Sequence, residues 1–122
     1  MAAKALPARM RIRLVFDSGL VLGPGKVDLL EGIRETGSIS AAGRRMKMSY
    51  KRAWDLIDAM NRHFDAPVVE TAKGGNGGGG ARLTAWGEEV VRRYRHLEAG
   101  AVEAASSHIG YLHRHMTPPT GG

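Results

Sequence analysis

The chain has 122 residues, of which 43% are hydrophobic and 25% charged, and this ordinary globular composition excludes a chain that is disordered throughout. No stretch approaches the roughly 18 consecutive apolar residues of a membrane-spanning helix, and the first ten residues lack the apolar core of a secretory signal, so we expect a cytoplasmic protein with no membrane contact. The absence of cysteine excludes disulfides and thiolate chemistry, while a formal net charge of +6 makes nucleic acid the first partner to consider.

The basic residues are concentrated in the middle of the chain. Residues 38–64 carry six basic side chains and two acidic ones. The basic members are Arg44, Arg45, Lys47, Lys51, Arg52 and Arg62. Residues 84–122 carry four of each sign, and there Glu88 with Arg92 and Glu89 with Arg93 have the spacing of ion pairs along one helix. We therefore expect an anion-binding surface in the central segment.

The first elements are predicted from alternation and from turn residues. Residues 9–16 alternate basic and apolar side chains, which is typical of a half-buried strand. A turn at residues 17–19 and a second apolar run at residues 20–22 complete a hairpin. A helix should begin at Pro24, because proline at the first helical position loses only an amide that would be unpaired, and it should end at Gly37.

The next segment predicts two helices joined by a tight turn. Ser38 caps a short helix that ends near Lys47, and Gly43 lets another helix approach it closely. Ser49 caps a longer helix that runs to about Phe64. The inward-facing residues are Ile39, Ala42 and Met46 on the first helix and Ala53, Leu56, Ile57 and Met60 on the second. This order is typical of a helix-turn-helix.

A hairpin and a long helix complete the chain. Pro67 breaks the helical pattern, after which residues 68–72 predict a strand that pairs with residues 82–84. Thr84 caps a helix over residues 85–115, whose apolar stripe is longer than one small core can cover. The stripe comprises Val90, Tyr94, Leu97, Ala101, Ala104, His108 and Tyr111. Its excess length predicts contact with a second copy of the chain.

These elements define the fold class and the division of the chain. We predict a mainly α structure with small β elements, a winged helix-turn-helix followed by a long C-terminal dimerisation helix. The predicted division is a flexible N-terminus over residues 1–8, a winged helix-turn-helix DNA-binding domain over 9–84, the dimerisation helix over 85–115 and a flexible tail over 116–122.

The second helix of the motif carries the side chains expected to contact DNA. Its N-terminal turns should enter the major groove, which is wide enough for one helix. Lys51 and Arg52 can donate to guanine or to phosphate, and Asp55 can accept from cytosine or instead orient Arg52. Trp54 is either a packing residue or a base contact. The candidate DNA contacts in the two helices are Ser38, Ser40, Arg44, Ser49, Tyr50, Lys51, Arg52, Trp54 and Asp55.

Six of the seven residues 74–80 are glycine, which raises the possibility of a loop that cradles phosphate. The loop lacks the Lys followed by Ser or Thr of a Walker A motif, so nucleotide binding is not predicted. A glycine tip instead lets the backbone approach a DNA groove, and the alternative is a plain flexible loop. The candidate contacts in this hairpin are Lys73, Gly75, Asn76, Gly77 and Arg82.

No motif predicts catalysis or a metal site. His108, His113 and His115 are accompanied by no carboxylate cluster, and the first two lack the i, i+4 spacing of helical ligands. The sequence contains no HExxH, GxSxG, kinase or Rossmann motif. We therefore predict a protein that is not an enzyme and needs no metal or cofactor.

Four segments resemble one known family. They are residues 37–42 (Gly-Ser-Ile-Ser-Ala-Ala), 48–54 (Met-Ser-Tyr-Lys-Arg-Ala-Trp), 58–61 (Asp-Ala-Met-Asn) and 74–84, the glycine run with Ala-Arg-Leu-Thr. Together they are similar to the N-terminal DNA-binding domain of ModE-type molybdate-responsive transcriptional regulators, a winged helix-turn-helix related to the LysR type. The likeness covers residues 10–90, and Ser-Tyr-Lys-x-Ala-Trp combined with a polyglycine wing is its most specific part.

The resemblance implies a homodimer that binds a palindromic operator in double-stranded DNA and represses or activates molybdenum-related genes. Family members that sense molybdate carry C-terminal oxyanion-binding domains, and the sequence has nothing similar after its fourth helix, so we expect molybdate not to bind this chain directly. Two alternatives use the same features: a basic interaction module or co-regulator that binds an acidic partner, and a small oxyanion binder or enzyme built on the glycine loop. Neither has a positive motif in the sequence.

Overall fold

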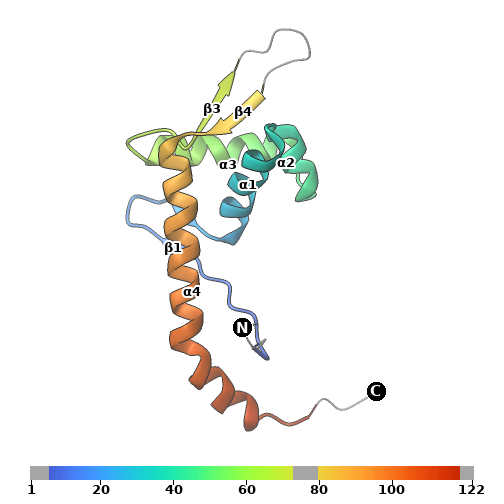
Figure 1. The fold of residues 1–122 in the computed structure, drawn as a ribbon, viewed down its shortest axis with the longest axis vertical. Helices are drawn as coiled ribbons and strands as arrows, with labels where there is room; N and C mark the ends of the chain where they lie inside the picture. The colour runs from blue at the N-terminus through green and yellow to red at the C-terminus, as the bar shows by residue number, and fades with distance from the viewer. Residues whose placement is uncertain (1–5, 73–79, 119–122) are drawn as a thin grey trace.

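The computed structural model describes residues 6–72 and 80–118, and most of them are helical. Its elements in chain order are β1 (Leu14–Val15), β2 (Val21–Leu22), α1 (Pro24–Thr36), α2 (Ile39–Arg45), α3 (Tyr50–His63), β3 (Val69–Ala72), β4 (Gly80–Leu83) and α4 (Ala85–Arg114). Figure 1 shows α1, α2, α3 and the two hairpins gathered into a head, with α4 running along one side of it and far beyond. We refer to residues 14–94 as the head and to residues 95–114 as the stalk. The predicted winged helix-turn-helix with a long C-terminal helix is confirmed.

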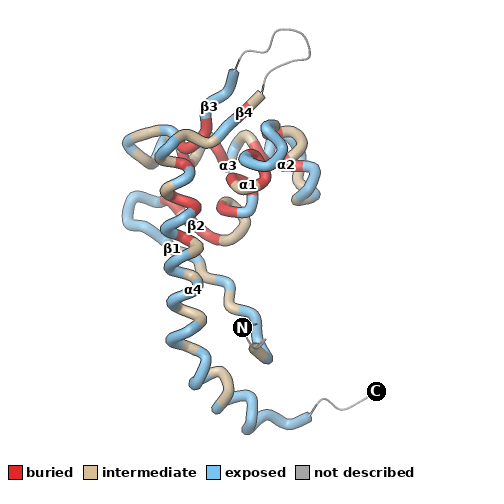
Figure 2. Tube along the Cα trace, viewed as in Figure 1, coloured by how far each residue is buried: buried red, intermediate tan, exposed pale blue. Residues whose placement is uncertain are grey.

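α1 begins and ends where the sequence predicts. Pro24 follows the N-cap Gly23, and Gly37 ends the helix with a φ of 71°, in the left-handed region that favours glycine. The buried apolar side chains come from α1, α2, α3, the hairpins and the first turns of α4, as Figure 2 shows in red. The largest of them are Tyr94, Leu29, Leu30, Ile33, Ile57, Met60, Val27 and Val68. The predicted inward faces of the helices therefore form one core.

The N-terminal hairpin is much shorter than predicted. β1 and β2 pair through Leu14 opposite Leu22 and Val15 opposite Val21 only. The predicted strand over residues 9–16 is wrong in extent, because β2 ends where α1 begins and residues 9–13 have no partner strand. The predicted alternation is nevertheless present in the burial of residues 9–13, because the apolar residues there are half-buried and the arginines are exposed.

The second hairpin forms the wing of the fold. β3 and β4 are antiparallel, with Val69 opposite Leu83, so the predicted pairing is confirmed. The second strand begins at Gly80 rather than at Arg82, and it ends before Thr84 because that residue serves as the N-cap of α4. The second strand thus includes Gly80, the last residue of the glycine run.

A short segment before β3 fixes the start of α4 against α3. The Asn61 side chain of α3 accepts a hydrogen bond from the Val68 amide at 2.8 Å. From the other side, Thr84 donates its amide to the Val68 carbonyl at 3.0 Å and its hydroxyl to the Pro67 carbonyl at 2.6 Å. Gly87 packs so closely on the Val68 carbonyl that a Cβ would have no space there. We refer to this set of contacts as the Val68 junction.

Arg95 fixes the base of the stalk to α1. Its guanidinium group contacts Glu31 at 2.7 Å, and it also pairs with Asp28 of α1 and with Glu98 of α4. The hydrogen bond from Arg95 holds the pKa of the Glu31 carboxyl below its ordinary value. These contacts set the direction in which α4 leaves the head.

One ion pair predicted along α4 is wrong and the other is confirmed. Glu88 pairs with Arg34 of α1 at 2.8 Å and not with Arg92. Arg92 and Arg93 both contact Glu89 instead. The difference arises because α1 packs against the first turns of α4 and brings Arg34 to Glu88, which helical spacing alone does not predict.

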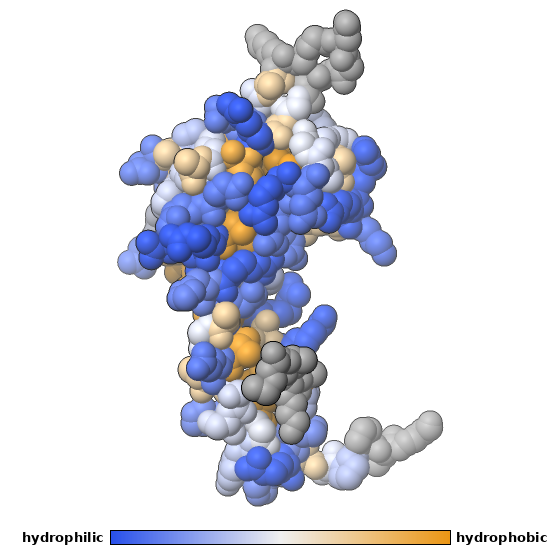
Figure 3. All heavy atoms as spheres, in the orientation of Figure 1, coloured by the Kyte–Doolittle hydropathy of each residue, from blue (hydrophilic) through white to orange (hydrophobic). Residues whose placement is uncertain are grey.

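The stalk extends beyond the core. Every residue of the stalk, all of which the structure describes, is half-buried or exposed. Leu97 is 39% exposed, Tyr111 57% and Leu112 59%. Figure 3 shows apolar surface on the stalk just below the head. The predicted stripe therefore divides at Tyr94, with its first residues in the core and the rest on the surface.

The Val68 junction makes glycine necessary at position 87 of α4. We expect Gly87→Ala to lower the free energy of unfolding by about 1–3 kcal/mol, because the added methyl group must displace the Val68 backbone. Gly100→Ala is the matched control, since a Cβ at Gly100 meets nothing within 4 Å on the same helix. It should be neutral or stabilising by up to about 1 kcal/mol. Urea unfolding followed by circular dichroism measures both, and equal values for the two variants would contradict the close packing.

Candidate nucleic-acid interface

The helix-turn-helix is rigid because α2 and α3 cross at a glycine. A Cβ at Gly43 would lie 3.2 Å from the Cβ of Ala53, so the two helices are in close contact, as predicted. α2 ends at Arg45, two residues earlier than predicted, because Lys47 adopts a left-handed φ of 58°. The Met48 amide then donates to the Gly43 carbonyl at 3.0 Å. This turn sets the angle at which α3 projects.

The predicted capping residues begin both helices. The Ser38 hydroxyl accepts from the Ala41 amide at 3.0 Å, and the Ser49 hydroxyl accepts from the Arg52 amide at 3.1 Å. The two hydroxyls are therefore engaged within the protein. What remains for an anion at each helix start is the set of free amides of the first turn.

α3 presents an outward face of alternating charges. Lys51 pairs with Asp55 at 3.0 Å, and Arg62 pairs with Asp58 at 3.1 Å, each at i, i+4 spacing. The Lys51 side chain is 84% exposed, so this pair is solvated and contributes little to stability. Asp55 thus holds Lys51 and not Arg52, which answers one alternative left open by the sequence. The outward face of α3 therefore offers a hydrogen-bond donor and an acceptor one helical turn apart.

Two aromatic side chains of α3 lie beside the wing. Tyr50 and Trp54 contact edge to face, with ring centroids 6.2 Å apart. With Ser40 and with residues of β3 and β4 they line a hollow of about 160 Å³. Trp54 is half-buried and packs against the core, while Tyr50 is 58% exposed. Trp54 therefore has the packing role that the sequence suggested and still reaches the surface.

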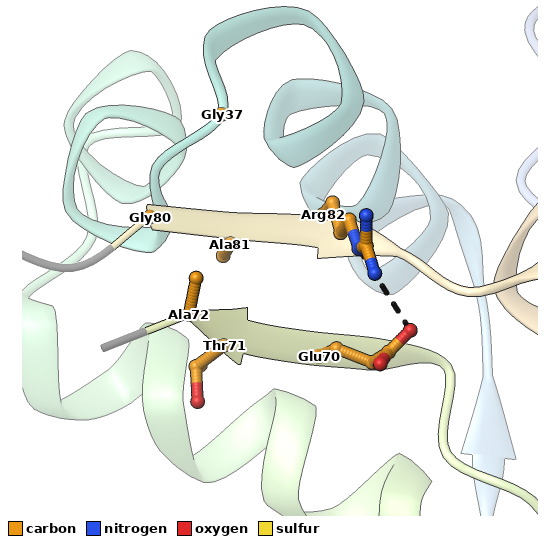
Figure 4. A pocket seen from close by; sticks show the side chains of 7 residues that line it. All are labelled: Gly37, Glu70, Thr71, Ala72, Gly80, Ala81 and Arg82. Carbon is orange, nitrogen blue, oxygen red and sulfur yellow. Dashed lines mark ion pairs between the residues drawn. The ribbon is translucent and has the colours of Figure 1, made fainter. Parts of the chain in front are cut away.

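The wing is attached to the helix-turn-helix through its second strand. The Ala81 amide of β4 donates to the Gly37 carbonyl, between α1 and α2, at 2.9 Å. Residues of this strand and of β3, together with Gly37, line a hollow of about 260 Å³. Figure 4 shows these residues, with Arg82 and Glu70 reaching toward each other. Their closest atoms are 3.9 Å apart and Arg82 is 81% exposed. Arg82 is thus held by the strand and by a long ion pair with Glu70, and its side chain remains accessible to a ligand.

The remaining candidates of α2 form a small polar group near the start of that helix. Arg44 donates to the Ser40 hydroxyl at 2.8 Å, and Arg44 is exposed. Neighbouring Arg45 contacts Glu35 of α1 at 2.7 Å. The wing-tip candidates Lys73, Gly75, Asn76 and Gly77 lie outside the described residues.

One basic cluster was not predicted as a site. Arg11 and Arg13, from the segment before β1, lie with Lys26 of α1 and Arg52 of α3 around a single cleft. The period-two spacing of Arg11 and Arg13 is the sequence signal that places them on one face. No pattern along the chain indicates that this face meets the start of α1, because the contact depends on the tertiary fold.

The described residues include neither a metal-binding cluster nor a membrane-spanning helix. Over residues 6–72 and 80–118, no group of three or more His, Asp or Glu side chains is arranged to hold a metal ion. None of the helices in that part of the chain is both long and apolar enough to cross a bilayer.

The sequence matches one family of regulators. The sequence model of the family described as "Bacterial regulatory helix-turn-helix protein, lysR family" matches residues 26–88, which is more than half of the chain. The matched region runs from the first turn of α1 through the helix-turn-helix and the wing to the first turn of α4. It thus contains nearly all of the candidate interface described above.

Two of three similar relatives have molybdenum in their names. The "Molybdenum-pterin-binding protein MopB" of Rhodobacter capsulatus is 49% identical over 90 residues, which are 74% of this chain and 33% of the relative. The "Molybdenum transport protein ModE" of Azotobacter vinelandii is 39% identical over 112 residues, 92% of this chain and 40% of the relative. The "DNA-binding transcriptional dual regulator ModE" of Escherichia coli K12 is 38% identical over 89 residues, 73% of this chain and 34% of the relative. The resemblance to ModE-type regulators is confirmed, and the chain spans between a third and two fifths of the length of these relatives.

The position of Trp54 beside the wing makes it a reporter of ligand binding. The chain has two tryptophans, and Trp86 packs edge to face on Phe64 at 5.4 Å, on another side of the head. In a Trp86→Phe variant, we expect duplex DNA to shift the fluorescence of Trp54 to shorter wavelength, because the ligand removes water from the hollow. In the control Trp54→Phe, the emission of Trp86 should stay constant. The opposite pattern would show that the ligand binds elsewhere.

Proposed function

Because this chain belongs to the lysR family of bacterial regulatory helix-turn-helix proteins, we propose that it binds double-stranded DNA sequence-specifically and regulates transcription, with α3 in the major groove. The observation that carries the proposal is the exposed face of α3, which is held rigidly by the α2 crossing and by the Ser49 cap. Lys51 and Asp55 lie at its centre, and they offer a donor and an acceptor to base edges. A role in transcription implies that the protein acts in the cytoplasm and not as an enzyme.

The proposed contacts divide between bases and backbone. Tyr50, Lys51 and Asp55 are assigned to the major groove, and Arg52 and Arg82 to phosphates on the two sides of it. The first turns of α2 and α3 present free amides to phosphate. The full proposed set is Ser38, Ser40, Arg44, Ser49, Tyr50, Lys51, Arg52, Trp54, Asp55 and Arg82, with Lys73, Gly75, Asn76 and Gly77 in the wing tip.

A homodimer is the second part of the proposal. The stalk carries apolar side chains that the head does not cover, among them Leu97 and Tyr111. Val15 and Phe16, in the hairpin between β1 and β2, are exposed in the same way. A two-fold dimer through the stalk would present two α3 helices to the two halves of a palindromic operator.

The third part concerns molybdenum. The relatives' names connect them with molybdenum and its transport, and this supports a role for the chain in controlling molybdenum-related genes. Among residues 6–72 and 80–118 we assign no site for molybdate, and direct sensing of that anion is not part of the proposed function. We propose the division of the chain into a DNA-binding domain over 9–84 and a dimerisation helix over 85–115.

Selection of bound duplexes from a random pool tests the proposed function. At about 150 mM salt, where long-range phosphate attraction is screened, we expect recovery of a palindromic site. Its half-sites should lie about 34 Å apart, or a multiple of that distance, as a two-fold dimer requires. Recovery of no sequence above background would instead favour a basic module that binds an acidic protein.

Lys51 is expected to read a base. Lys51→Ala should weaken binding to the selected site about 10- to 100-fold and binding to random duplex far less, since a base contact contributes only on the correct sequence. Arg62→Ala is the matched control, because Arg62 is paired with an aspartate on the same face but lies at the far end of α3. Titrations by fluorescence anisotropy measure both variants. An equal loss on both duplexes, with a smaller salt dependence, would make Lys51 a phosphate contact.

The stalk is expected to hold the dimer. In Leu97→Glu/Tyr111→Glu, both substitutions fall on exposed positions of the apolar stripe, so the head should stay folded while the dimer dissociates. Sedimentation equilibrium should then give the mass of one chain. Ser106→Glu, on the opposite side of the same helix, should remain dimeric. A wild-type chain that sediments as a monomer at micromolar concentration would contradict the proposed dimer.

A further inference from the structure

Four cations surround a cleft on the side of α3 that faces away from the wing. The cleft has a volume of about 450 Å³ and is open to solvent. Its basic residues are Arg11, Arg13, Lys26 and Arg52, from three separate parts of the chain. Met48 and Leu56 also line it. The cleft is therefore a concave surface lined by four cations and by apolar side chains.

The cleft is an uncompensated concentration of positive charge. Its lining, which lies entirely within the described residues, includes no acidic side chain. Other cations of the head have carboxylate partners, such as Arg34 with Glu88 and Arg45 with Glu35. In the described part of the chain, none of the four cleft cations forms an ion pair. Burial lowers the pKa of the Lys26 ammonium group, and the nearby Arg52 and Arg13 lower it further. An anion in the cleft would relieve this repulsion.

The arginines before β1 are held in place by the fold. The Tyr94 hydroxyl donates to the Ile12 carbonyl at 2.7 Å, which anchors the backbone between Arg11 and Arg13. Gly23 lets this segment lie against the start of α1, since a Cβ there would be 3.3 Å from the Cγ of Arg13. The backbone that carries Arg11 and Arg13 is thus in place before any ligand arrives, which lowers the entropic cost of binding.

The cleft and the wing flank α3 on opposite sides. Tyr50 and Trp54, four residues apart, face the wing. Arg52 and Leu56, also four residues apart, face the cleft. Lys51 and Asp55 lie between these two rows, because a helix turns by about 100° per residue. A groove that receives the outward face of α3 therefore has one backbone strand near the wing and the other near the cleft.

We propose that this cleft binds a phosphate group of the DNA backbone, so that α3 is held in its groove between the wing on one strand and the cleft on the other. The inference rests on the proposed DNA binding and adds a site that the recognition helix alone does not supply. Guanidinium groups suit a phosphodiester because they donate two parallel hydrogen bonds to it. The contact carries no sequence information and acts on every duplex alike.

Two variants test the cleft without disturbing the core. Lys26→Gln removes one of its cations. Gly25→Glu places a carboxylate on its rim, where a Cβ meets nothing within 4 Å, and an acidic residue in the first turn of α1 suits the helix dipole. Both variants should therefore unfold at the temperature of the wild type or above it. Arg92→Gln and Ser106→Glu on α4 are controls that make the same change in net charge far from the cleft.

Each cleft variant should bind the selected operator and random duplex about tenfold more weakly at about 150 mM salt, by the same factor on both. The slope of log K against log salt should fall by about 0.9 for the phosphate contact that is lost. The controls should change the affinity by less than about twofold. Affinities equal to those of the controls would overturn the proposal, and so would a loss confined to the operator.

A free oxyanion is the other possible source of the same chemistry. If inorganic phosphate raises the melting temperature of the wild type but not of Lys26→Gln at matched ionic strength, while the DNA affinity of Lys26→Gln is unchanged, the cleft takes a free anion and the DNA assignment fails. The proposed function and the cleft fail separately. If the wild type selects no sequence, the proposed regulatory function is contradicted. The proposed phosphate site is tested separately, by the affinity of the cleft variants for random duplex.

Discussion

The relative positions of α3, the wing and α4 depend on how the chain is held at the Val68 junction. A single extended segment there receives Asn61 from the end of α3 and Thr84 from the start of α4, so one stretch of backbone aligns these three elements. Val68 is buried and Asn61 and Thr84 are half-buried, and a hydrogen bond left unmade in such a place is costly. Gly87 completes the junction, because only a residue without a side chain lets α4 approach so closely. The wing gains a second attachment where Ala81 donates to Gly37.

The parts of the fold that follow from local chemistry could be predicted from the sequence. The serine and threonine caps, the left-handed glycine after α1 and the apolar spacing of α3 each act within a few residues, so the helices begin and end close to the predicted positions. The predictions failed where a distant partner decides the outcome. Residues 9–13 have the alternation of a strand but meet no second strand, and Glu88 takes Arg34 from another helix in preference to its own neighbour. The same distinction holds for the candidate interface. The outward face of α3 could be predicted from the sequence, whereas the cleft around Lys26 forms only when three segments pack together.

The charged contacts of α4 connect the head mechanically to the stalk. Arg95 binds two carboxylates of α1 and a third on its own helix, and the hydrogen bond to Glu31 raises the pKa of its guanidinium group further above the ordinary value. Arg34 adds a second bridge to Glu88, two helical turns before Arg95 on the same side of α4. In the proposed dimer, the spacing of the two recognition helices would be set by the angle of the stalk, and these side chains define that angle. A network of charges is suited to this role because its geometry is directional, unlike that of the apolar core.

In the proposed complex, the central lysine and aspartate of α3 would attract DNA only weakly, because the fields of opposite charges 3.0 Å apart nearly cancel at distances much greater than that separation. Long-range attraction to DNA would then come from the cations of the cleft beside α3, which form no ion pair within the described residues. On non-cognate sequences the cations beside α3 would hold the molecule on the DNA and allow it to slide, while Lys51 and Asp55 remain paired with each other. Opening the exposed pair costs less than ~1 kcal/mol, and that cost is recovered only where a base edge replaces both partners. Searching and reading would thus be carried out by different side chains, and either one could change during evolution without loss of the other.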